Sequence, residues 1–297
     1  MTEKVFIVGG TGHIGERCVQ QLLNNNVHVT LYTRSPAKVQ AKFPQAAIVE
    51  GDYNDLTPLE KGIAGHTRLF LLIADLVNMP HIKGAISAKA CATGVKQIVD
   101  LSSLAVTLPW RSTFLGNTHR LSEEAILASR SSAVATADSI TTGYVALRPT
   151  MFMTNHLWID AQTIKNEGVL RHTADPDELE GWISNNDIGD LAAIVLQEPI
   201  EKHGDAVYEM TGCVLTPAQR IAALGKVAGR EIGYTKISTK EKYDFLTTKM
   251  GMPHIMAMDL LGLFKGVNTV SVGLSVLLGR EPESFEQWLE HNKDVFQ

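Results

Sequence analysis

The sequence of 297 residues predicts an α/β protein built on a doubly wound parallel sheet. Two observations predict this fold. Short apolar runs alternate along the chain with segments whose apolar residues recur at helical spacing, a pattern typical of strand–helix–strand units. A glycine-rich turn also follows the first apolar run, at residues 9–15. Because right-handed crossovers join the strands of such sheets, we expect ligands to bind at the carboxyl ends of the strands.

The first predicted strand covers residues 5–8 (VFIV), which are too apolar to alternate and are therefore expected to be buried on both faces. Gly9, Gly12 and Gly15 follow with the spacing GxxGxxG, and helical periodicity begins at Ile14. Glycine permits a sharp turn, close approach of backbone N–H groups to a pyrophosphate, and tight packing of helix on strand. The order strand, turn, helix predicts a dinucleotide-binding turn, and an ordinary glycine-rich connection is the alternative interpretation.

The second predicted strand, residues 27–32, indicates which dinucleotide binds. An NAD-binding unit typically has an Asp or Glu about 20 residues past the glycines, which holds the ribose 2′-hydroxyl. No acidic residue stands here: Arg34 takes that place and Lys38 lies one turn further on. Two cations are suited to a 2′-phosphate, so the sequence predicts NADP(H). The alternative is a solvated loop and helix start.

Further strands are predicted at 46–49, 69–74, 97–101 and 144–147, and helices near 56, at 82–93 and at 121–127. Asp52 follows the third strand, where two roles are equally open: contact with the adenine amino group of a cofactor, or a cap for the next helix. Ala74 lies where a cofactor crosses the edge of the sheet.

Composition and charge exclude several classes of function. Apolar residues make up 44% of the chain, enough for a sizeable core, and the formal charge of -5 gives no electrostatic reason to expect nucleic acid. Three widely spaced cysteines, Cys18, Cys91 and Cys213, favour a reducing compartment over a disulfide framework or a zinc site. No apolar run reaches the roughly 18 residues that span a bilayer, and no signal peptide is evident, so we expect a cytoplasmic protein without a membrane partner.

Several stretches then resemble the NmrA-like group of atypical short-chain dehydrogenases/reductases. They are GGTGHIG in the first turn, LSS after the fifth strand, LRPTMFMTN at 147–155, WISNNDIGDLAA at 182–193, and the segments 208–212, 216–224 and 277–289. The resemblance covers nearly the whole chain. It implies a Rossmann fold that binds NADP(H), and a small, mainly helical C-terminal lobe that closes over a substrate cleft. The implied nucleotide-binding domain is 1–154 with 182–211 returning to it, and the lobe is 155–181 with 212–297.

The resemblance also implies which residues contact the cofactor. The residues implied to bind the pyrophosphate are Gly9, Thr11, Gly12, His13 and Ile14. Arg34 is implied to bind the 2′-phosphate, with Lys38 in support, and Ser102 and Ser103 are implied to lie beside the nicotinamide. The residues implied to contact the nicotinamide and to form the floor of the substrate site are Pro149, Thr150, Met151 and Phe152. Core packing is the alternative for Met151, Phe152 and Met153. His13 either contacts the cofactor or faces water. A metal-binding role is not indicated, because no second metal ligand lies near His13 in the sequence.

The usual catalytic pair of short-chain dehydrogenases is a tyrosine with a lysine four residues later. None of the six tyrosines has one. In that region stands His119 with Glu123 four residues on, a pattern that resembles NmrA-like sequences. On one helix face the carboxylate can orient the imidazole and raise its pKa, so that His119 donates a proton as hydride arrives. Two alternatives are open: a supporting pair on a surface helix, and a Glu123 that only packs under the helix. Ser102 joins these two residues as a candidate catalytic residue.

Two segments depart from the expected pattern. Residues 128–143 (ASRSSAVATADSITTG) are predicted to form a loop, with a subunit contact or a cleft rim as its open roles. Residues 250–278 are rich in Met, Leu, Gly and Val and predict short helices with an apolar face. That face has three open interpretations: a pocket for a flat apolar substrate, a homodimer surface, or ordinary core.

Two classes of function follow. The first is a reductase, in which NADPH delivers hydride to a carbonyl, imine or activated C=C of an apolar small molecule. The second is a regulatory NADP(H) sensor that acts through a protein partner. The missing Tyr/Lys pair favours the sensor, and the apolar C-terminal segment favours the enzyme. The sequence leans to the enzyme, although a fold by itself does not fix a function.

Overall fold

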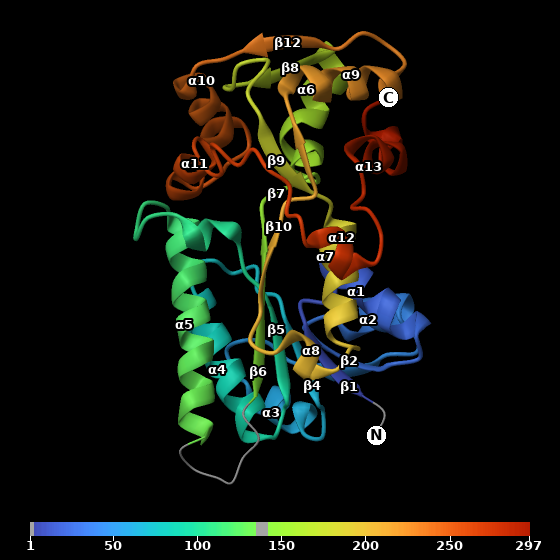
Figure 1. The fold of residues 1–297 in the computed structure, drawn as a ribbon, viewed down its shortest axis with the longest axis vertical. Coiled ribbons are helices and arrows are strands. Elements are labelled where there is room, and N and C mark those ends of the chain that lie inside the picture. The colour runs from blue at the N-terminus through green and yellow to red at the C-terminus, as the bar shows by residue number, and fades with distance from the viewer. Residues whose placement is uncertain (1–2, 135–141) are drawn as a thin grey trace. The chain divides into compact units, whose positions relative to one another are not determined.

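The structure, a computed structural model, describes residues 3–134 and 142–297. The chain forms two compact units (Figure 1). The first comprises Met1–Val106, Gly116–Arg148 and Ile188–Tyr208, and the second comprises Thr107–Leu115, Pro149–Asp187 and Glu209–Gln297. Residues 149–154 and 182–187, which the sequence assigns to the nucleotide-binding domain, pack within the second unit.

The first unit is built on a seven-stranded sheet with the order β10-β6-β5-β4-β1-β2-β3. Its strands are β1 (Lys4–Val8), β2 (His28–Thr33), β3 (Ala47–Glu50), β4 (Arg68–Leu71), β5 (Gln97–Leu101), β6 (Gly143–Pro149) and β10 (Val207–Met210). The pairings from β3 through β6 are parallel; Ile7 of β1, for example, aligns with Leu31 of β2 and Phe70 of β4. Strands β2 and β4 lie on either side of β1, so the strand order changes direction there. The predicted doubly wound α/β fold is confirmed.

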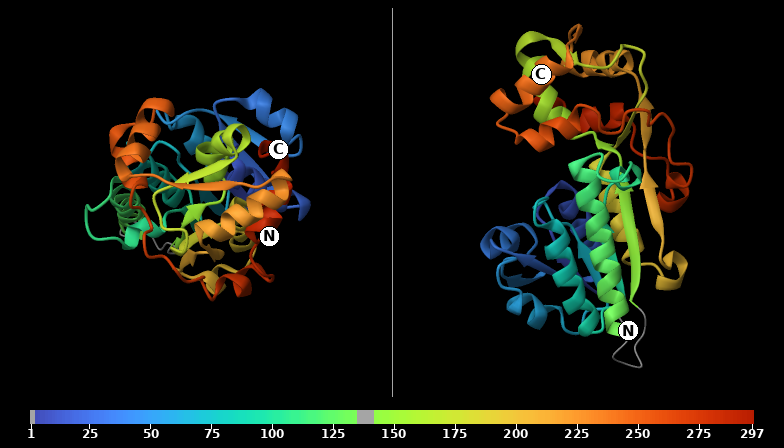
Figure 2. Two further views of the ribbon diagram at one scale, coloured as in Figure 1. Left: turned by 90° about the horizontal axis from the view of Figure 1, so that it is seen from above. Right: turned by 90° about the vertical axis from the view of Figure 1, so that its left-hand side faces the viewer.

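Helices cover both faces of this sheet. In Figure 1, α4 (Met79–Ala92) and α5 (Phe114–Val134) lie on one side, with α1 (His13–Asn24) and α7 (Asn185–Val195) on the other. The right-hand view of Figure 2 shows α4 and α5 side by side, and Ser129 Oγ of α5 donates a hydrogen bond to the Gly84 carbonyl of α4 at 3.1 Å. On the other face, Arg17 of α1 pairs with Asp190 of α7, with Nε 2.6 Å from Oδ1. Shorter helices are α2 (Pro36–Lys42), α3 (Thr57–Ile63) and α8 (Ile200–His203).

Apolar strands form the core of the first unit. All four residues predicted to be buried on both faces of the sheet, Val5 to Val8, are 0% exposed. Phe6 and Val8 pack with the apolar residues of β4 and β5, such as Leu69, Leu71 and Ile98, and with the inner faces of α3 and α4. Transfer of this surface out of water stabilises the sheet and fixes the loops at its carboxyl edge.

The prediction of a loop at residues 128–143 is wrong in its first part. Helix α5 continues to Val134. Its Ser129 hydroxyl donates to the Ala125 carbonyl within the helix and to the Gly84 carbonyl of α4, and Arg130 is buried and pairs with Asp205. These contacts with the rest of the first unit therefore outweigh the loop-like composition of this stretch. The rest of the predicted loop, residues 135–141, lies outside the described residues.

The second unit contains two small sheets and several helices. Its strands are β7 (Met151–Phe152), β9 (Glu180–Ile183) and β11 (Cys213–Leu215), ordered β11-β9-β7, and the parallel pair β8 (Val169–His172) and β12 (Gly233–Lys236). Its helices are α6 (Ala161–Glu167), α9 (Pro217–Ala228), α10 (Thr239–Asp244), α11 (His254–Leu260), α12 (Leu274–Leu278) and α13 (Phe285–His291). Aromatic side chains, including Trp182, Phe285 and Trp288, form its core.

The methionine-rich stretch 250–278 forms short helices, α11 and α12, as predicted. Ala257 and Leu274 are buried in the second unit, whereas Ile255, Met258 and Val276 are at least half exposed. The segment therefore contributes to the core on one face and keeps apolar side chains exposed on another. No helix of residues 3–134 and 142–297 has both the length and the apolar character needed to cross a membrane.

Candidate functional site

The turn after β1 requires glycine at its two ends. Gly9 has φ +90°, and a Cβ there would stand 2.3 Å from the Leu72 carbonyl oxygen of the loop after β4. A Cβ on Gly15 would stand 2.1 Å from the carbonyl oxygen of Gly9 itself. Because both obstacles are backbone atoms, they cannot move aside as a flexible side chain does. These two glycines therefore allow α1 to pack directly against the carboxyl end of β1.

Gly12, between them, stands in open space. A Cβ at Gly12 would meet no atom within 4 Å. Gly12 is also the N-cap of α1 and provides no side-chain cap, and the neighbouring Thr11 and His13 are exposed. This 12-residue helix thus begins at an exposed position without a side-chain cap, with the positive end of the helix dipole at the turn. This arrangement fits a pyrophosphate group.

Two exposed cations follow β2. Arg34 lies directly after the strand and Lys38 lies in α2, and neither side chain forms an ion pair among the described residues. Strand β2 ends at Thr33 without an acidic side chain. The carboxyl edge therefore offers positive charge at the position where the sequence analysis expects a ribose.

Asp52 does not cap α3. Its Oδ1 accepts a hydrogen bond from the Asn54 amide at 2.7 Å, and the first turn of α3 is held instead by Asp55, whose Oδ1 accepts from the Thr57 amide at 2.9 Å. The capping alternative for Asp52 is therefore wrong, and the adenine contact stays a prediction. Ala74 is exposed beyond the end of β4. Ser103 is buried after β5, where its hydroxyl accepts from the Ala105 amide.

A buried polar cluster joins β5, α5 and β6. The Ser102 hydroxyl donates to Glu123 Oε1 at 2.5 Å. The same carboxylate accepts two hydrogen bonds from the Arg148 guanidinium, one from Nε to Oε1 at 2.9 Å and one from Nη2 to Oε2 at 2.5 Å. This two-point geometry is the strong form of a charge-assisted pair. Two of the three candidate catalytic residues, Ser102 and Glu123, thus come together, with Arg148 as a partner that the sequence analysis missed.

A second buried pair lies beside this cluster. Lys83 of α4 and Asp100 of β5 are both 0% exposed, with Nζ 2.6 Å from Oδ1. Lys83 also donates to the Leu101 carbonyl at 2.8 Å, and Tyr144 donates to Asp100 at 3.3 Å. Burial, together with the negative charge of Asp100, raises the pKa of Tyr144. The tyrosine is therefore a neutral structural donor.

The expectation that Glu123 raises the pKa of His119 is wrong. The imidazole is 7% exposed, and no hydrogen bond joins it to Glu123 in the part of the chain that the structure describes. Burial, and then the positive charge of Lys83, lower the pKa of His119 well below its usual value. Its Nδ1 is buried without a hydrogen-bond partner among those residues. His119 is therefore a neutral imidazole near physiological pH.

The segment expected to line the nicotinamide and substrate floor belongs to the second unit. Thr150 is buried, and its amide and hydroxyl both donate to the Met210 carbonyl at 3.1 Å. Met151 aligns with Trp182 of β9 and Phe152 with Ile183, and both are half-buried. Met153 is fully buried, so core packing is confirmed for one of the three apolar residues.

Arg148, Lys83 and Asp100 are the residues of this cluster that the sequence analysis missed. A signal for them exists in the sequence. Asp100 interrupts the apolar strand QIVDL, and Arg148 ends the apolar run YVAL. A charge in a strand buried on both faces needs a partner, so such interruptions indicate buried ion pairs. Lys83, in a helix of mixed composition, carries no comparable signal.

Within 3–134 and 142–297, no three His, Cys, Asp or Glu side chains come close enough together to hold a metal ion. The glycine turn, by contrast, fits the phosphates of a dinucleotide by its open space and its backbone donors.

Comparison with known proteins agrees with this geometry. A family model described as NAD(P)H-binding matches residues 9–199. An NAD(P)H azoreductase from Xenophilus azovorans is 27% identical over 260 residues, which cover 85% of this chain and 83% of the azoreductase. The crystal structure of an NADPH-dependent quinone oxidoreductase from Escherichia coli in complex with NADPH is 25% identical with a TM-score of 0.81, and the match covers 97% of this chain and 99% of that one.

NmrA, a negative transcriptional regulator solved in complex with NADP, shares the fold with a TM-score of 0.76 at 14% identity, over 99% of this chain and 97% of NmrA. The family match spans more than half of the chain and includes the whole glycine turn, Arg34 and the Ser102, Glu123 and Arg148 cluster. The resemblance to the NmrA-like group is thereby confirmed, and the chain belongs to the NAD(P)H-binding family.

Proposed function

We propose that the protein is an NADPH-dependent oxidoreductase that reduces a carbonyl, imine or activated C=C of an apolar small molecule. The observation that carries this proposal is the open glycine turn combined with two unpaired cations after the next strand. Gly12 has nothing within 4 Å of its Cβ position, and Arg34 and Lys38 are exposed without an ion-pair partner in the described chain. Together they match a pyrophosphate and an additional 2′-phosphate.

The reaction class is supported by the relatives. One is named an NAD(P)H azoreductase and another an NADPH-dependent quinone oxidoreductase. Azo groups and quinones are both conjugated, electron-poor acceptors, and both are flat. We therefore infer a flat, conjugated acceptor as the substrate.

The bound cofactor supplies hydride from C4 of its nicotinamide. In this proposal the neutral imidazole of His119 donates a hydrogen bond to the substrate atom that gains electron density. A neutral imidazole is suited to this task because it polarises an acceptor without adding a fixed charge to a buried site. The low pKa of His119, caused by burial and Lys83, keeps it in that form. The proton that completes the product then comes from water.

Glu123 and Arg148 act as positioning residues in this proposal. Their pairing holds the Ser102 hydroxyl, whose proton points to Glu123 Oε1. Ser102 follows β5, at the carboxyl edge where ligands of this fold bind. A rigid cluster at this place fixes the loop after β5 against the cofactor ring that the resemblance places there.

The second candidate function is a non-catalytic NADP(H) sensor that acts through a protein partner. The observation in its favour is the missing proton relay, because no tyrosine has a lysine four residues on and His119 is neutral. A sensor needs the cofactor site and no proton donor. Both candidate functions therefore require NADP(H) binding, and only the reductase requires oxidation of NADPH.

The test is NADPH oxidation, followed by absorbance at 340 nm, across quinones, azo dyes, enones, aromatic ketones and imines. We expect turnover with at least one flat conjugated acceptor, and His119→Ala should lower kcat about tenfold or more with little change in NADPH affinity. His81→Ala, a change at an exposed histidine of α4, is the matched control. NADPH binding without oxidation by any acceptor would favour the sensor and contradict the reductase.

A further inference from the structure

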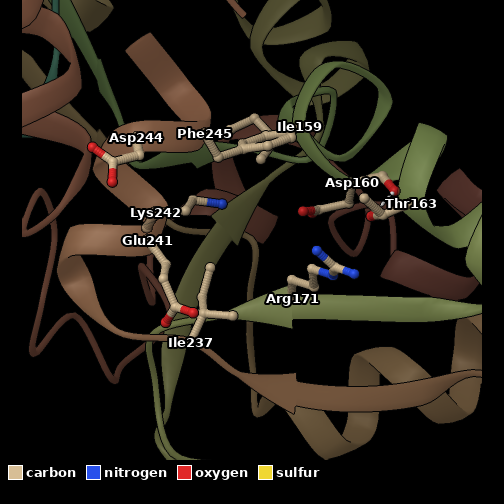
Figure 3. A pocket seen from close by; sticks show the side chains of 9 residues that line it. All are labelled: Ile159, Asp160, Thr163, Arg171, Ile237, Glu241, Lys242, Asp244 and Phe245. Carbon is tan, nitrogen blue, oxygen red and sulfur yellow. Dashed lines mark hydrogen bonds between the residues drawn. The ribbon is translucent and has the colours of Figure 1, made fainter. Parts of the chain in front are cut away.

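A pocket of about 240 Å³ lies wholly within the second unit. It is lined by the end of the helical turn at Ile159 and Asp160, by β8 at Arg171, and by α10 around Lys242 (Figure 3). The pocket is smaller than the roughly 300–1,000 Å³ typical of sites for drug-sized ligands, so it suits a small molecule. None of the residues proposed for the cofactor or the hydride step lines it.

Five charged side chains line this pocket, and four of them have partners. Asp160 pairs with His156, Arg171 with Glu167, Glu241 with the amide and hydroxyl of Ser238, and Asp244 with Lys240. The fifth is Lys242. Its ammonium makes no hydrogen bond or ion pair with any residue in the described ranges 3–134 and 142–297. An ammonium has three donors, so this pocket holds unused donor capacity.

Lys242 is nevertheless a buried residue. It is only 8% exposed, and Figure 3 shows its ammonium and the Asp160 carboxylate pointing into the pocket from opposite sides. Burial lowers the pKa of Lys242, and the negative charge of Asp160 opposes that shift. The Lys242 Nζ lies 6.0 Å from the centre of the Phe245 ring, a cation–π contact that uses none of its hydrogen-bond donors. A lysine side chain normally extends its charged end into water. The inward orientation indicates that something polar belongs beside this ammonium.

The carboxylate opposite Lys242 is held in place from behind. Asp160 Oδ2 accepts from His156 Nδ1 at 2.6 Å, and the His156 ring stacks on Trp182 with a centroid distance of 4.5 Å. Although burial acts against it, the hydrogen bond from His156 lowers the pKa of Asp160 to about 2. Asp160 therefore stays ionised and is held by His156, and the hydrogen-bond donors of Lys242 are open to a ligand in the pocket.

The remaining wall of the pocket is apolar. Ile159, Ile237 and the Phe245 ring contribute to it. Ile159 and Phe245 belong to two π-helical turns, His156–Asp160 and Phe245–Lys249, that border the pocket. Such turns are rare in proteins, and those that occur are often found at functional sites. An occupant thus needs one anionic group for Lys242 and a small hydrocarbon body for this wall.

We propose that this pocket is a second ligand site, which binds a small carboxylate with an aromatic or short aliphatic body, the carboxylate accepting hydrogen bonds from Lys242. The site is independent of the proposed hydride transfer, since its residues lie in the second unit and none of them contributes to the glycine turn.

The test is isothermal titration calorimetry of the full-length protein with benzoate at pH 7, without nucleotide. We expect saturable binding to the wild-type protein and at least about tenfold weaker binding to Lys242→Met, which keeps the length of the side chain and removes its charge. Lys249→Met is the matched control. Lys249 is exposed and does not line the pocket, so its loss should leave benzoate binding unchanged.

Two further ligands test the chemistry of the site. Benzamide has the shape of benzoate without its charge, and inorganic phosphate has charge without an apolar body. We expect neither to bind comparably. Equal binding of benzamide would overturn the role of the ammonium, and equal binding of phosphate would overturn the role of the apolar wall.

A measurement on the wild-type protein keeps the proposal testable if Lys242→Met fails to fold. Benzoate should protect Lys242, but not Lys249, from acetylation by acetic anhydride, as read by peptide mass spectrometry. No saturable benzoate binding, or equal labelling of Lys242 with and without benzoate, would overturn the proposal. Neither result bears on NADPH binding or oxidation, so the two proposals fail separately.

Discussion

The carboxylate of Glu123 in α5 binds the guanidinium of Arg148 in β6 at two points, with distances of 2.9 and 2.5 Å. The pair is largely buried, with side chains 10% and 17% exposed. It holds the Ser102 hydroxyl as a third member. The helix and two neighbouring strands are thus joined at the carboxyl edge of the sheet, where the cofactor is proposed to bind.

Glu123→Gln should destabilise the protein by about 2 kcal/mol, because it leaves the Arg148 charge largely buried without its counterion. The measurement is urea unfolding at pH 7. Glu124→Gln, a change at the exposed neighbouring residue, is the control and should change the free energy of unfolding by less than about 0.5 kcal/mol. Equal effects of the two substitutions would contradict a structural role for the pair.

The low pKa of His119 predicts a pH dependence of stability. The folded protein keeps this imidazole neutral, whereas the unfolded chain takes up a proton below the usual pKa of 6.5. The contribution of His119 to the free energy of unfolding is therefore fully present above pH 6.5 and is lost as the pH falls below it. The loss approaches about 1.4 kcal/mol per pH unit.

Urea unfolding of the wild-type protein and His119→Gln between pH 7 and pH 5 measures this contribution. The wild-type free energy of unfolding should fall more steeply with decreasing pH than that of the variant. His81→Gln removes an exposed histidine and should keep the wild-type slope. Parallel pH profiles for wild type and His119→Gln would show that His119 is not held neutral by burial.

Two glycines of the turn are predicted to have different roles: Gly15 in the packing of α1, and Gly12 in the binding of NADPH. Gly15→Ala should cost about 2 kcal/mol of stability, because its Cβ would meet the Gly9 carbonyl at 2.1 Å. Gly12→Ala should leave stability within about 0.5 kcal/mol of wild type, since Gly12 has extended backbone and no atom within 4 Å. Its methyl group would stand where the pyrophosphate is proposed to bind, so NADPH affinity should fall at least about tenfold.

Thermal or urea unfolding and calorimetric NADPH titration of the same two variants check this pair of expectations. A Gly12→Ala protein that folds and binds NADPH like wild type would contradict the pyrophosphate role of the turn. The comparison is informative because the two glycines lie three residues apart in one motif.

Local features of the fold were predictable from the sequence, and long-range partners were not. The run VFIV and the glycines after it are contiguous in the sequence, so their pattern alone indicates a strand and a turn, although the atom that restricts Gly9, the Leu72 carbonyl oxygen, comes from the loop after β4. Helix α5 is longer than predicted because contacts of Ser129 with α4 and of Arg130 with Asp205 outweigh the loop-like composition of its end. Tertiary context overrides propensity in this way.

The candidate catalytic cluster shows the same limit. Spacing of four residues places His119 and Glu123 on one helix face, and this is all that the sequence reveals. The sheet then brings Arg148 to Glu123, and Lys83 and Asp100 to the neighbourhood of His119, from positions far along the chain. Partners of this kind depend on strand order, which follows only from the complete fold.

The measurement that tests the central claim most directly is calorimetric titration of the wild-type protein and Arg34→Ala with NADPH and NADH. We expect wild type to bind NADPH more tightly than NADH. Arg34→Ala should weaken NADPH binding about tenfold or more and leave NADH binding nearly unchanged, because only NADPH has the 2′-phosphate. Equal losses for both nucleotides, or no heat from either with the wild-type protein, would contradict the proposed recognition of NADPH.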